Sequence, residues 1–241
     1  MNEKNMLINA LKEINIELED YQTDQLLTYY NMLIEKNKVM NLTAITEFDE
    51  FVYKHLIDSL MLNRVCNLKK KQNILDLGTG AGFPGIPLKI VHPELKIVLL
   101  DSLNKRVKFL DEVILELGLK NIYGIHGRAE DYGRNEEYRE KFDLCVSRAV
   151  ANLSTLAEYC IPFVKKGGRF ISYKSGKVKE ELELSKNAVK ELGGKFMGVD
   201  TFVIPGTDIK RTLVIVEKEK PTPKKYPRSA GKPLKEPIMG D

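Results

Sequence analysis

The chain has few of the residues and patterns that mark membrane, secreted or metal-binding proteins. Its 241 residues include three cysteines, Cys66, Cys145 and Cys160, with no CxxC spacing. Neither a disulfide framework nor a metal site is therefore indicated. No apolar run approaches the roughly 20 residues that a membrane-spanning helix needs, and the first 20 residues contain acids throughout and no signal-peptide core. We expect a cytoplasmic protein without metal or membrane contact.

Charge is balanced along most of the chain and becomes basic only near its C-terminal end. With 43% hydrophobic and 30% charged residues, the composition is that of an ordinary globular protein. Residues 218–241, however, carry seven Lys or Arg against three Asp or Glu. Such a segment is a candidate for contacting phosphates. The alternative is a solvated, proline-rich tail that only promotes solubility.

The first 70 residues are predicted to form a helical N-terminal extension. One apolar stripe includes Leu7 and Leu11, and a second includes Leu26 and Leu33, at the i, i+3/i+4 spacing of amphipathic helices. A third helix is predicted to start at Thr46, because the sequence TEFD (46–49) matches a capping box in its acidic form.

From residue 73 onward, short β-favouring runs alternate with helical stretches. This alternation predicts an α/β domain over residues 71–241, with a seven-stranded, mostly parallel sheet, ending in the basic tail (219–241). No helix separates the last two runs, which should form an antiparallel hairpin at the sheet edge. The predicted strands are 73–78, 96–101, 121–126, 142–147, 168–174, 196–204 and 211–217, with a further helix at about 177–192.

The segment NILDLGTGAGFPGIPLKI (73–90) concentrates glycines directly after the first predicted strand. It lacks the lysine and hydroxyl residue of a phosphate-binding P-loop. It also fails the GxGxxG dinucleotide pattern, because Phe83 stands where the third glycine must pack against a helix. The spacing is instead Gly78-x-Gly80-x-Gly82, which lets backbone approach a ligand closely while Phe83 forms a wall.

The ends of the next strands carry polar residues suited to a nucleoside. Asp101 ends the second strand, where its carboxylate can accept hydrogen bonds from two ribose hydroxyls. Further polar groups follow the third strand, at 126–131, and the fourth strand, at 146–149. Ligands of open parallel sheets bind outside the carboxyl ends of the strands, so these groups should converge on one site.

An ordered set of motifs identifies the chain as resembling class I S-adenosylmethionine-dependent methyltransferases, which have a Rossmann-like fold. More narrowly, it resembles the glucose-inhibited division protein B family, the ribosomal RNA small subunit methyltransferase G family. The motifs are KNKVMNLTAI (36–45), HLIDSL (55–60), LDLGTGAGFPGIPL (75–88), RAED (128–131), SRAV (147–150), KRTLVIV (210–216) and YPRSAGKP (226–233).

The resemblance implies transfer of a methyl group from S-adenosylmethionine to N7 of a guanine in 16S, small-subunit ribosomal RNA. It also implies that Gly78 and Phe83 line the cofactor loop and that Arg148 closes the pocket near the reacting end. Ala129 and Glu130 would flank the adenine. To these cofactor-binding candidates the loop spacing adds Gly80, and the strand-end argument adds Asp101.

Guanine N7 carries a lone pair and no proton, so we expect positioning residues and no catalytic acid or base. The RNA major groove is too narrow for direct access, so the guanine must lie in a loop or be flipped out. The candidates for contacting RNA are Asn41, His55, Arg128 and Arg211, and each has a structural alternative. These are a capping role before a helix for Asn41, a satisfied core histidine for His55, a local salt bridge for Arg128 and an edge-strand charge for Arg211.

The expected partner is 16S ribosomal RNA or the small ribosomal subunit, and the expected state is a monomer. One rival interpretation is a methyltransferase of a small molecule or a protein. Another is a non-enzymatic ribosomal RNA-binding or assembly factor that retains the fold. An NAD-dependent oxidoreductase is a more distant rival. The sequence does not specify which guanine is modified.

Overall fold

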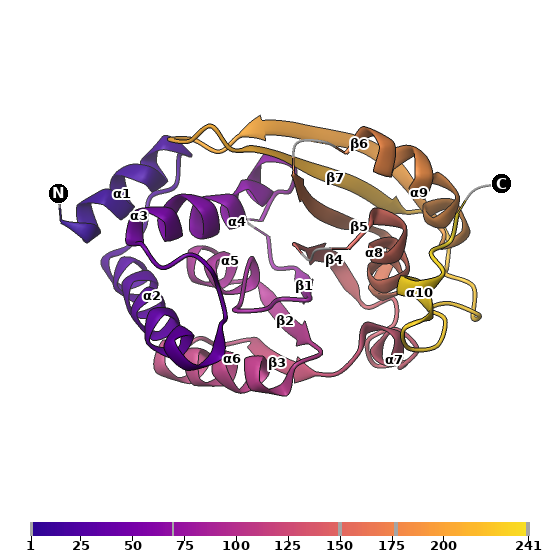
Figure 1. Cartoon of the computed structure of the whole chain (residues 1–241), viewed down its shortest axis with the longest axis horizontal. Helices are drawn as coiled ribbons and strands as arrows, with labels where there is room; N and C mark the ends of the chain where they lie inside the picture. The colour runs from indigo at the N-terminus through magenta and orange to yellow at the C-terminus, as the bar shows by residue number, and fades with distance from the viewer. Residues whose placement is uncertain (1, 69, 149–150, 176–177, 240–241) are drawn as a thin grey trace.

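Seven strands build a central sheet that lies between two layers of helices (Figure 1). The computed structural model describes residues 2–68, 70–148, 151–175 and 178–239. The strands are β1 (Asn73–Leu77), β2 (Lys96–Asp101), β3 (Ile122–His126), β4 (Phe142–Ser147), β5 (Val164–Ser175), β6 (Gly194–Val203) and β7 (Lys210–Lys218). Residue 177 of the predicted helix, 149–150 of the SRAV motif and 240–241 of the predicted tail lie outside the described residues.

The sheet has the order β3-β2-β1-β4-β5-β7-β6. Strands β1 to β5 pair in parallel, and β7 is antiparallel to both of its neighbours, β5 and β6. The predicted mostly parallel sheet with an antiparallel edge hairpin is thereby confirmed. The strand order reverses between β1 and β4, so a crevice opens there at the carboxyl ends of the strands.

The helices form two layers around this sheet. The N-terminal part contains α1 (Glu3–Glu13), α2 (Asp20–Met40), α3 (Phe48–Glu50), the π-helical segment η1 (Phe51–Ile57), α4 (Asp58–Leu60) and the 3₁₀ turn η2 (Met61–Arg64). Within and after the sheet come α5 (Gly85–Val91), α6 (Asn104–Glu116), α7 (Ala129–Tyr132), α8 (Leu153–Cys160), η3 (Ile161–Phe163), α9 (Lys179–Glu191) and α10 (Lys232–Lys235). Within the described residues, none of these helices is both long and apolar enough to cross a bilayer.

The sheet separates two hydrophobic cores, because successive side chains of a strand point to opposite faces of the sheet. Ile74 packs in the core under the N-terminal helices, whereas Leu75 packs in the core under α8 and α9. The first core also contains Leu11 and Leu33 from α1 and α2. Helices α5 and α6 contact the strands of this face directly, and the N-terminal helices pack with them in the same core.

The third N-terminal helix begins later than the sequence predicts. Its N-cap is Glu47, with no side-chain capping bond, and the helix starts at Phe48. The prediction that Thr46 opens a capping box is wrong, because the first helical hydrogen bond runs from the Phe51 amide to the Glu47 carbonyl (2.9 Å), which makes Glu47 the N-cap. The helix then widens into the π-helical segment η1, a feature often found at functional sites.

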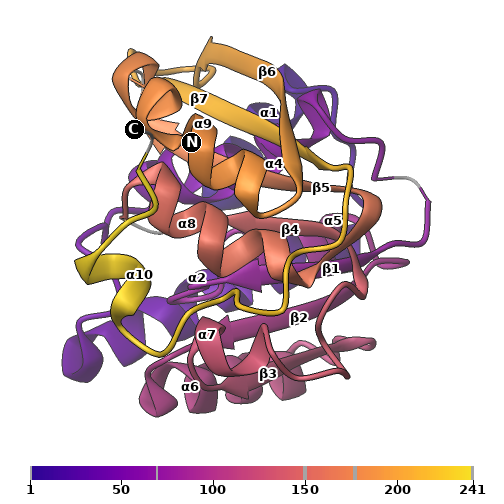
Figure 2. The same ribbon diagram turned by 90° about the vertical axis from the view of Figure 1, so that its right-hand side faces the viewer.

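The C-terminal segment folds back against the helical layer formed by α7 and α8 (Figure 2). Four of its basic residues form ion pairs with acids of the protein itself: Lys218 with Glu140, Lys225 with Glu191, Arg228 with Glu158 and Lys232 with Glu236. The alternative of a merely solvated tail is therefore wrong for the described residues.

Candidate cofactor and substrate cavities

The glycine loop after β1 has a backbone that only glycine adopts easily. Gly78, Gly80 and Gly82 have φ values of +70°, +63° and +107°, in the region that side chains with a Cβ rarely occupy. At Gly82 a Cβ would lie 2.6 Å from Ile86 Cγ1 and 2.9 Å from the Tyr29 hydroxyl. Tyr29, from α2, donates that hydroxyl to the Ala81 carbonyl (2.6 Å), so the N-terminal extension holds the loop in place.

Asp76 supports the same loop from beneath. Its Oδ2 accepts hydrogen bonds from the Thr79 hydroxyl (2.7 Å) and the Gly85 amide (2.8 Å). Its Oδ1 is buried without a hydrogen-bond partner among the described residues. Burial raises the pKa of Asp76 to about 6, although the bond from Thr79 opposes this shift. The loop is thus held by a buried carboxyl group in which Oδ2 is hydrogen-bonded and Oδ1 is not.

Asp101 connects the end of β2 to the glycine loop. Its Oδ2 accepts the Gly80 amide (2.9 Å) and lies 3.4 Å from Arg106 Nη1, while Oδ1 accepts the Leu103 amide (2.9 Å). The sequence predicts only a ribose contact for this carboxylate. The structure gives it a loop-holding role as well, and carboxylate oxygens have lone pairs left for a second acceptor role.

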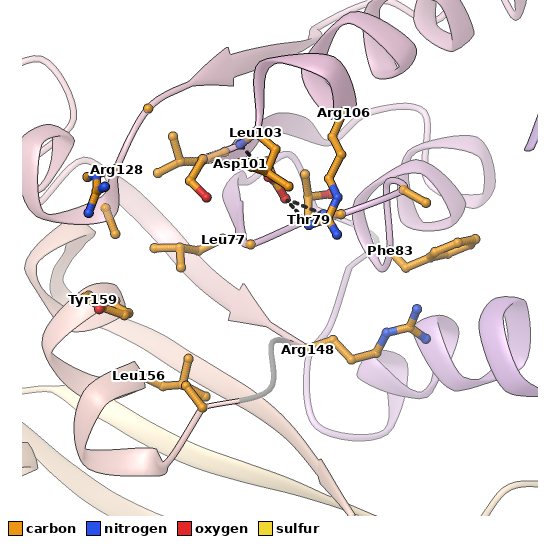
Figure 3. Close-up of a pocket in the computed structure, with 18 of the residues that line it drawn as sticks. Leu77, Thr79, Phe83, Asp101, Leu103, Arg106, Arg128, Arg148, Leu156 and Tyr159 are labelled. Atoms are coloured by element: carbon orange, nitrogen blue, oxygen red, sulfur yellow. Dashed lines mark hydrogen bonds and ion pairs between the residues drawn. The ribbon is translucent and has the colours of Figure 1, made fainter. Parts of the chain in front are cut away.

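A cavity of about 720 Å³ opens over the loop at the carboxyl ends of β1 to β4 (Figure 3). The volume lies within the range of about 300–1,000 Å³ typical of small-molecule sites. All seven predicted cofactor residues line it: Gly78, Gly80, Phe83, Asp101, Ala129, Glu130 and Arg148. Arg128 and His55, predicted as RNA contacts, line the same cavity.

Arg148, just after β4, joins several polar groups at one end of this cavity. Its Nη1 lies 3.1 Å from Asp58 Oδ2, and its Nη2 donates to His55 Nδ1 (3.2 Å). The guanidinium also lies over the Phe83 ring, 5.0 Å from the ring centroid. The other oxygen of Asp58 accepts Nε of Arg211 (3.2 Å). Asp58, only 1% exposed, therefore bridges Arg148, which follows β4, and Arg211 of β7.

His55 is held as a neutral ring. Because Arg148 only donates, Nδ1 must accept, which leaves the proton on Nε2 to be donated to the Thr43 hydroxyl oxygen (2.8 Å). Burial, together with the positive charge of Arg148, lowers the pKa of His55 to about 3. The ring stacks on Phe83 with centroids 4.3 Å apart. A neutral histidine of this kind fits a mechanism without acid catalysis.

The motif at the end of α2 explains how Thr43 reaches His55. The Asn37 side chain accepts the amides of Leu42 (2.6 Å) and Thr43 (3.0 Å), which fixes the turn. Asn41 ends α2 in the left-handed conformation, with φ of +49°. The structural alternative for Asn41 placed it before a helix and is wrong, because Asn41 terminates one. The residue lines neither the cavity over the glycine loop nor a second cavity that adjoins it.

A second cavity, of about 800 Å³, adjoins the first. It shares His55, Arg148 and Ala151 with the first cavity, and Arg211 lines it. Its remaining lining residues are Ile45, Lys54, Asp58, Asn152, Tyr173, Lys174, Ser175 and Glu181. The edge-strand alternative for Arg211 is wrong, because β7 lies between β5 and β6; the side chain has a structural role through its pairing with Asp58. Two ligands could therefore meet at Arg148.

The family model for rRNA small subunit methyltransferase G matches residues 22–209. The chain belongs to this family. It is 54% identical over 239 residues to ribosomal RNA small subunit methyltransferase G of Lachnoclostridium phytofermentans, covering 99% of each chain. It is 50% identical to the protein of the same name from Alkaliphilus metalliredigens, covering 99% of this chain and 100% of the relative. The predicted family is confirmed.

Solved structures support the fold class at much lower identity. MtNAS in complex with MTA and tNA superposes with a TM-score of 0.56 at 18% identity, covering 80% of this chain and 74% of that one. M. jannaschii TYW2 in complex with AdoMet gives 0.50 at 15% identity, covering 67% and 76%. Together with the family match, these likenesses confirm the Rossmann-like class I methyltransferase fold, and S-adenosylmethionine is the cofactor of this methyltransferase family.

Some site residues could not be recognised from the sequence. Tyr29 acts through a contact across the core, and no local pattern indicates it. Asn37 and Thr43 lie in the motif KNKVMNLTAI (36–45), which was the signal for them, although only Asn41 was selected from it. Gly231 and Leu234, from the C-terminal segment, line the first cavity. The motif YPRSAGKP (226–233) contains Gly231 but ends before Leu234, and the charge of the surrounding segment pointed to phosphate contact and gave no indication of a cavity wall.

Proposed function

We propose that the protein transfers a methyl group from S-adenosylmethionine to N7 of a guanine in 16S, small-subunit ribosomal RNA, with the first cavity holding the cofactor and the second the guanine. The observation that carries this proposal is the junction between the cavities at His55, Arg148 and Ala151. A methyl group that passes between two ligands requires such adjoining sites. Membership of a ribosomal RNA methyltransferase family supplies the chemistry.

The first cavity suits S-adenosylmethionine in shape and in the polar groups around it. The glycines of the loop place no side chain where a ligand approaches the backbone. The Asp101 carboxylate lines the cavity, where a ribose can donate hydrogen bonds to it. The buried, unpartnered Oδ1 of Asp76 adds negative character beneath the loop, which favours a cationic ligand. We assign Gly78, Gly80, Phe83, Asp101, Ala129, Glu130 and Arg148 to the cofactor.

The second cavity suits a flipped-out nucleotide. Its cationic groups, Lys54, Arg148, Lys174 and Arg211, outnumber its acids, Asp58 and Glu181, which favours a polyanion at its mouth. A cavity of about 800 Å³ also admits a base together with its sugar. We therefore assign Arg211 and His55 to the RNA side of the junction, with His55 acting through Arg148; Arg128, predicted as an RNA contact, lines only the first cavity.

The chemistry demands alignment rather than proton transfer. When bound, S-adenosylmethionine supplies an electrophilic methyl group on a sulfonium. The acceptor N7 has a free lone pair, so no residue needs to remove a proton. Phe83, stacked on His55 and covered by Arg148, gives a rigid wall that excludes water and orients the reactants. The Asp58 bridge fixes the side chain of Arg148 for this purpose.

We further propose that the active form is a cytoplasmic monomer acting on the ribosomal subunit, and that residues 1–70 and 71–241 are functionally distinct parts. The N-terminal part would present His55 and Asp58 to the substrate, while the methyltransferase domain holds the cofactor. Because the two parts share one core, they should unfold together.

The assignment of the second cavity is tested by the variants Lys174→Ala and Arg211→Ala, with Arg64→Ala as the matched control. Arg64 pairs with Asp200 at the surface (2.6 Å) and lines neither cavity. Methylation of small subunits from cells lacking the enzyme should show a raised KM for the subunit in the first two variants. Their Kd for S-adenosylmethionine should be unchanged. Equal subunit KM values in all three variants would contradict the assignment.

A further inference from the structure

The outer side of the first cavity is formed partly by the C-terminal segment, which lies beyond the residues matched by the family model. Gly231 and Leu234 line the cavity together with Leu156 and Tyr159 of α8. Leu234 is 59% exposed, a high value for an apolar side chain beside a cavity. In Figure 2, α10 lies beside α8, in agreement with the contacts between these two helices.

A buried ion pair anchors this segment to the helix that forms the cavity wall. Glu158 of α8 is 0% exposed and accepts both the backbone amide (2.7 Å) and the guanidinium Nη2 (2.7 Å) of Arg228. Arg139 adds bonds to the carbonyls of Thr222 (2.7 Å) and Tyr226 (2.8 Å). The segment is thereby held at several points before it reaches the cavity.

Two further bonds connect the segment to the cavity directly. The Gly231 amide donates to Oε1 of Glu130 (2.7 Å), and Glu130 is one of the residues assigned to the adenine side. On α8, the Thr155 hydroxyl donates to the Pro233 carbonyl (3.0 Å). Displacement of residues 231–234 would therefore free the Glu130 carboxylate and open the wall beside Leu234.

We propose that the C-terminal segment 226–236 is a structural wall of the cofactor site, with Leu234 covering the ligand and Gly231 fixing Glu130. This inference rests on the proposed assignment of the first cavity to S-adenosylmethionine. It also changes the role of the basic tail: its ion pairs serve to hold the wall in place, and contact with RNA phosphates is secondary. Because binding and ordering are linked, the cofactor should in turn stabilise the segment.

Calorimetric titration of the full-length protein with S-adenosylmethionine tests the wall, using Leu234→Ala and the control Leu184→Ala. Leu184, on α9, is 47% exposed and lines neither cavity. Because the bound cofactor would cover the exposed methyl groups of Leu234, their loss in Leu234→Ala should weaken cofactor binding by about 3- to 10-fold. It should leave Leu184→Ala like the wild type. Arg228→Ala, which loosens the whole segment, should weaken binding at least as much as Leu234→Ala.

A second readout separates a cofactor wall from an RNA-binding element. Binding of small ribosomal subunits without cofactor should be the same for Leu234→Ala and the wild type. Hydrogen exchange of the Gly231 amide should slow when the cofactor is added. Unchanged cofactor binding in both Leu234→Ala and Arg228→Ala would overturn the inference, as would weaker subunit binding at unchanged cofactor binding. Wild-type protein that binds cofactor but methylates no RNA would refute the proposed function alone.

Discussion

Replacing Asp58 by asparagine should destabilise the protein strongly, because the change leaves two arginines without their common carboxylate. Asp58 is 1% exposed and lies 3.1 Å from Arg148 and 3.2 Å from Arg211. Removing one partner of a buried ion pair typically costs about 3–5 kcal/mol. Both arginine side chains keep some solvent exposure, 18% and 26%, so we expect about 3 kcal/mol, near the lower end of that range.

The matched control is Asp200→Asn, which removes the same charge from an exposed pair. Asp200 accepts Nε (2.6 Å) and Nη2 (3.0 Å) of Arg64, with side-chain exposures of 26% and 43%. Exposed pairs contribute about 0–1 kcal/mol. Urea unfolding followed by circular dichroism should therefore separate the two variants by about 2 kcal/mol or more. If their free energies of unfolding agree within about 0.5 kcal/mol, the Asp58 bridge is not a major stabilising interaction.

Three further predictions follow from the loop and the cluster around Arg148. Gly85→Ala places a methyl group 2.3 Å from Leu99 Cδ2 and should lower the free energy of unfolding by about 1–3 kcal/mol; an unchanged urea midpoint would contradict this packing. His55, with its pKa lowered from 6.5 to about 3, binds fewer protons in the folded state, so its contribution to stability is lost as pH falls through that window. Asp76, with its pKa raised from 3.8 to about 6, contributes stability that is lost as pH rises through that window. Between pH 7 and pH 4, the free energy of unfolding should thus fall less in His55→Gln than in the wild type, and more in Asp76→Asn. The same pH dependence in all three proteins would refute both assignments. In Arg148→Lys, a single ammonium group cannot hydrogen-bond to both His55 and Asp58 and also cover the Phe83 ring, so the rate of methyl transfer should fall by about 10- to 100-fold. A wild-type rate would show that the guanidinium geometry is dispensable.

The strand pattern and the glycine loop were predictable because they depend on local chemistry. Alternation of short β-rich runs with helices indicated the sheet, and KIVLLD (96–101) and FDLCVS (142–147) match β2 and β4 residue for residue. Gly82 has a left-handed backbone and no room for a Cβ, so only glycine fits there, and the spacing of the glycines in the sequence therefore indicated the loop. The missing helix before the last strand similarly indicated the antiparallel hairpin.

The contacts that hold the site were not predictable, because they join residues that lie far apart in the chain. Thr46 has the pattern of a capping box, but tertiary packing starts the helix at Phe48 instead. The basic tail was interpreted from its charge, whereas its residues Lys225 and Arg228 are paired with acids of the protein. No local pattern indicates that Asp58 connects Arg148 to Arg211, since the three lie on different elements.

Mapping the methylated base tests the account most directly. The protein should be incubated with tritiated S-adenosylmethionine and small ribosomal subunits from cells lacking it. Bulk protein and naked ribosomal RNA would serve as parallel acceptors, and chain cleavage specific for N7-methylguanine would locate the label. We expect label in the ribosomal RNA at a single N7-methylguanine, and we expect Arg148→Lys to reduce this label strongly. Cofactor binding without label in RNA, or label at any other base atom, would contradict it.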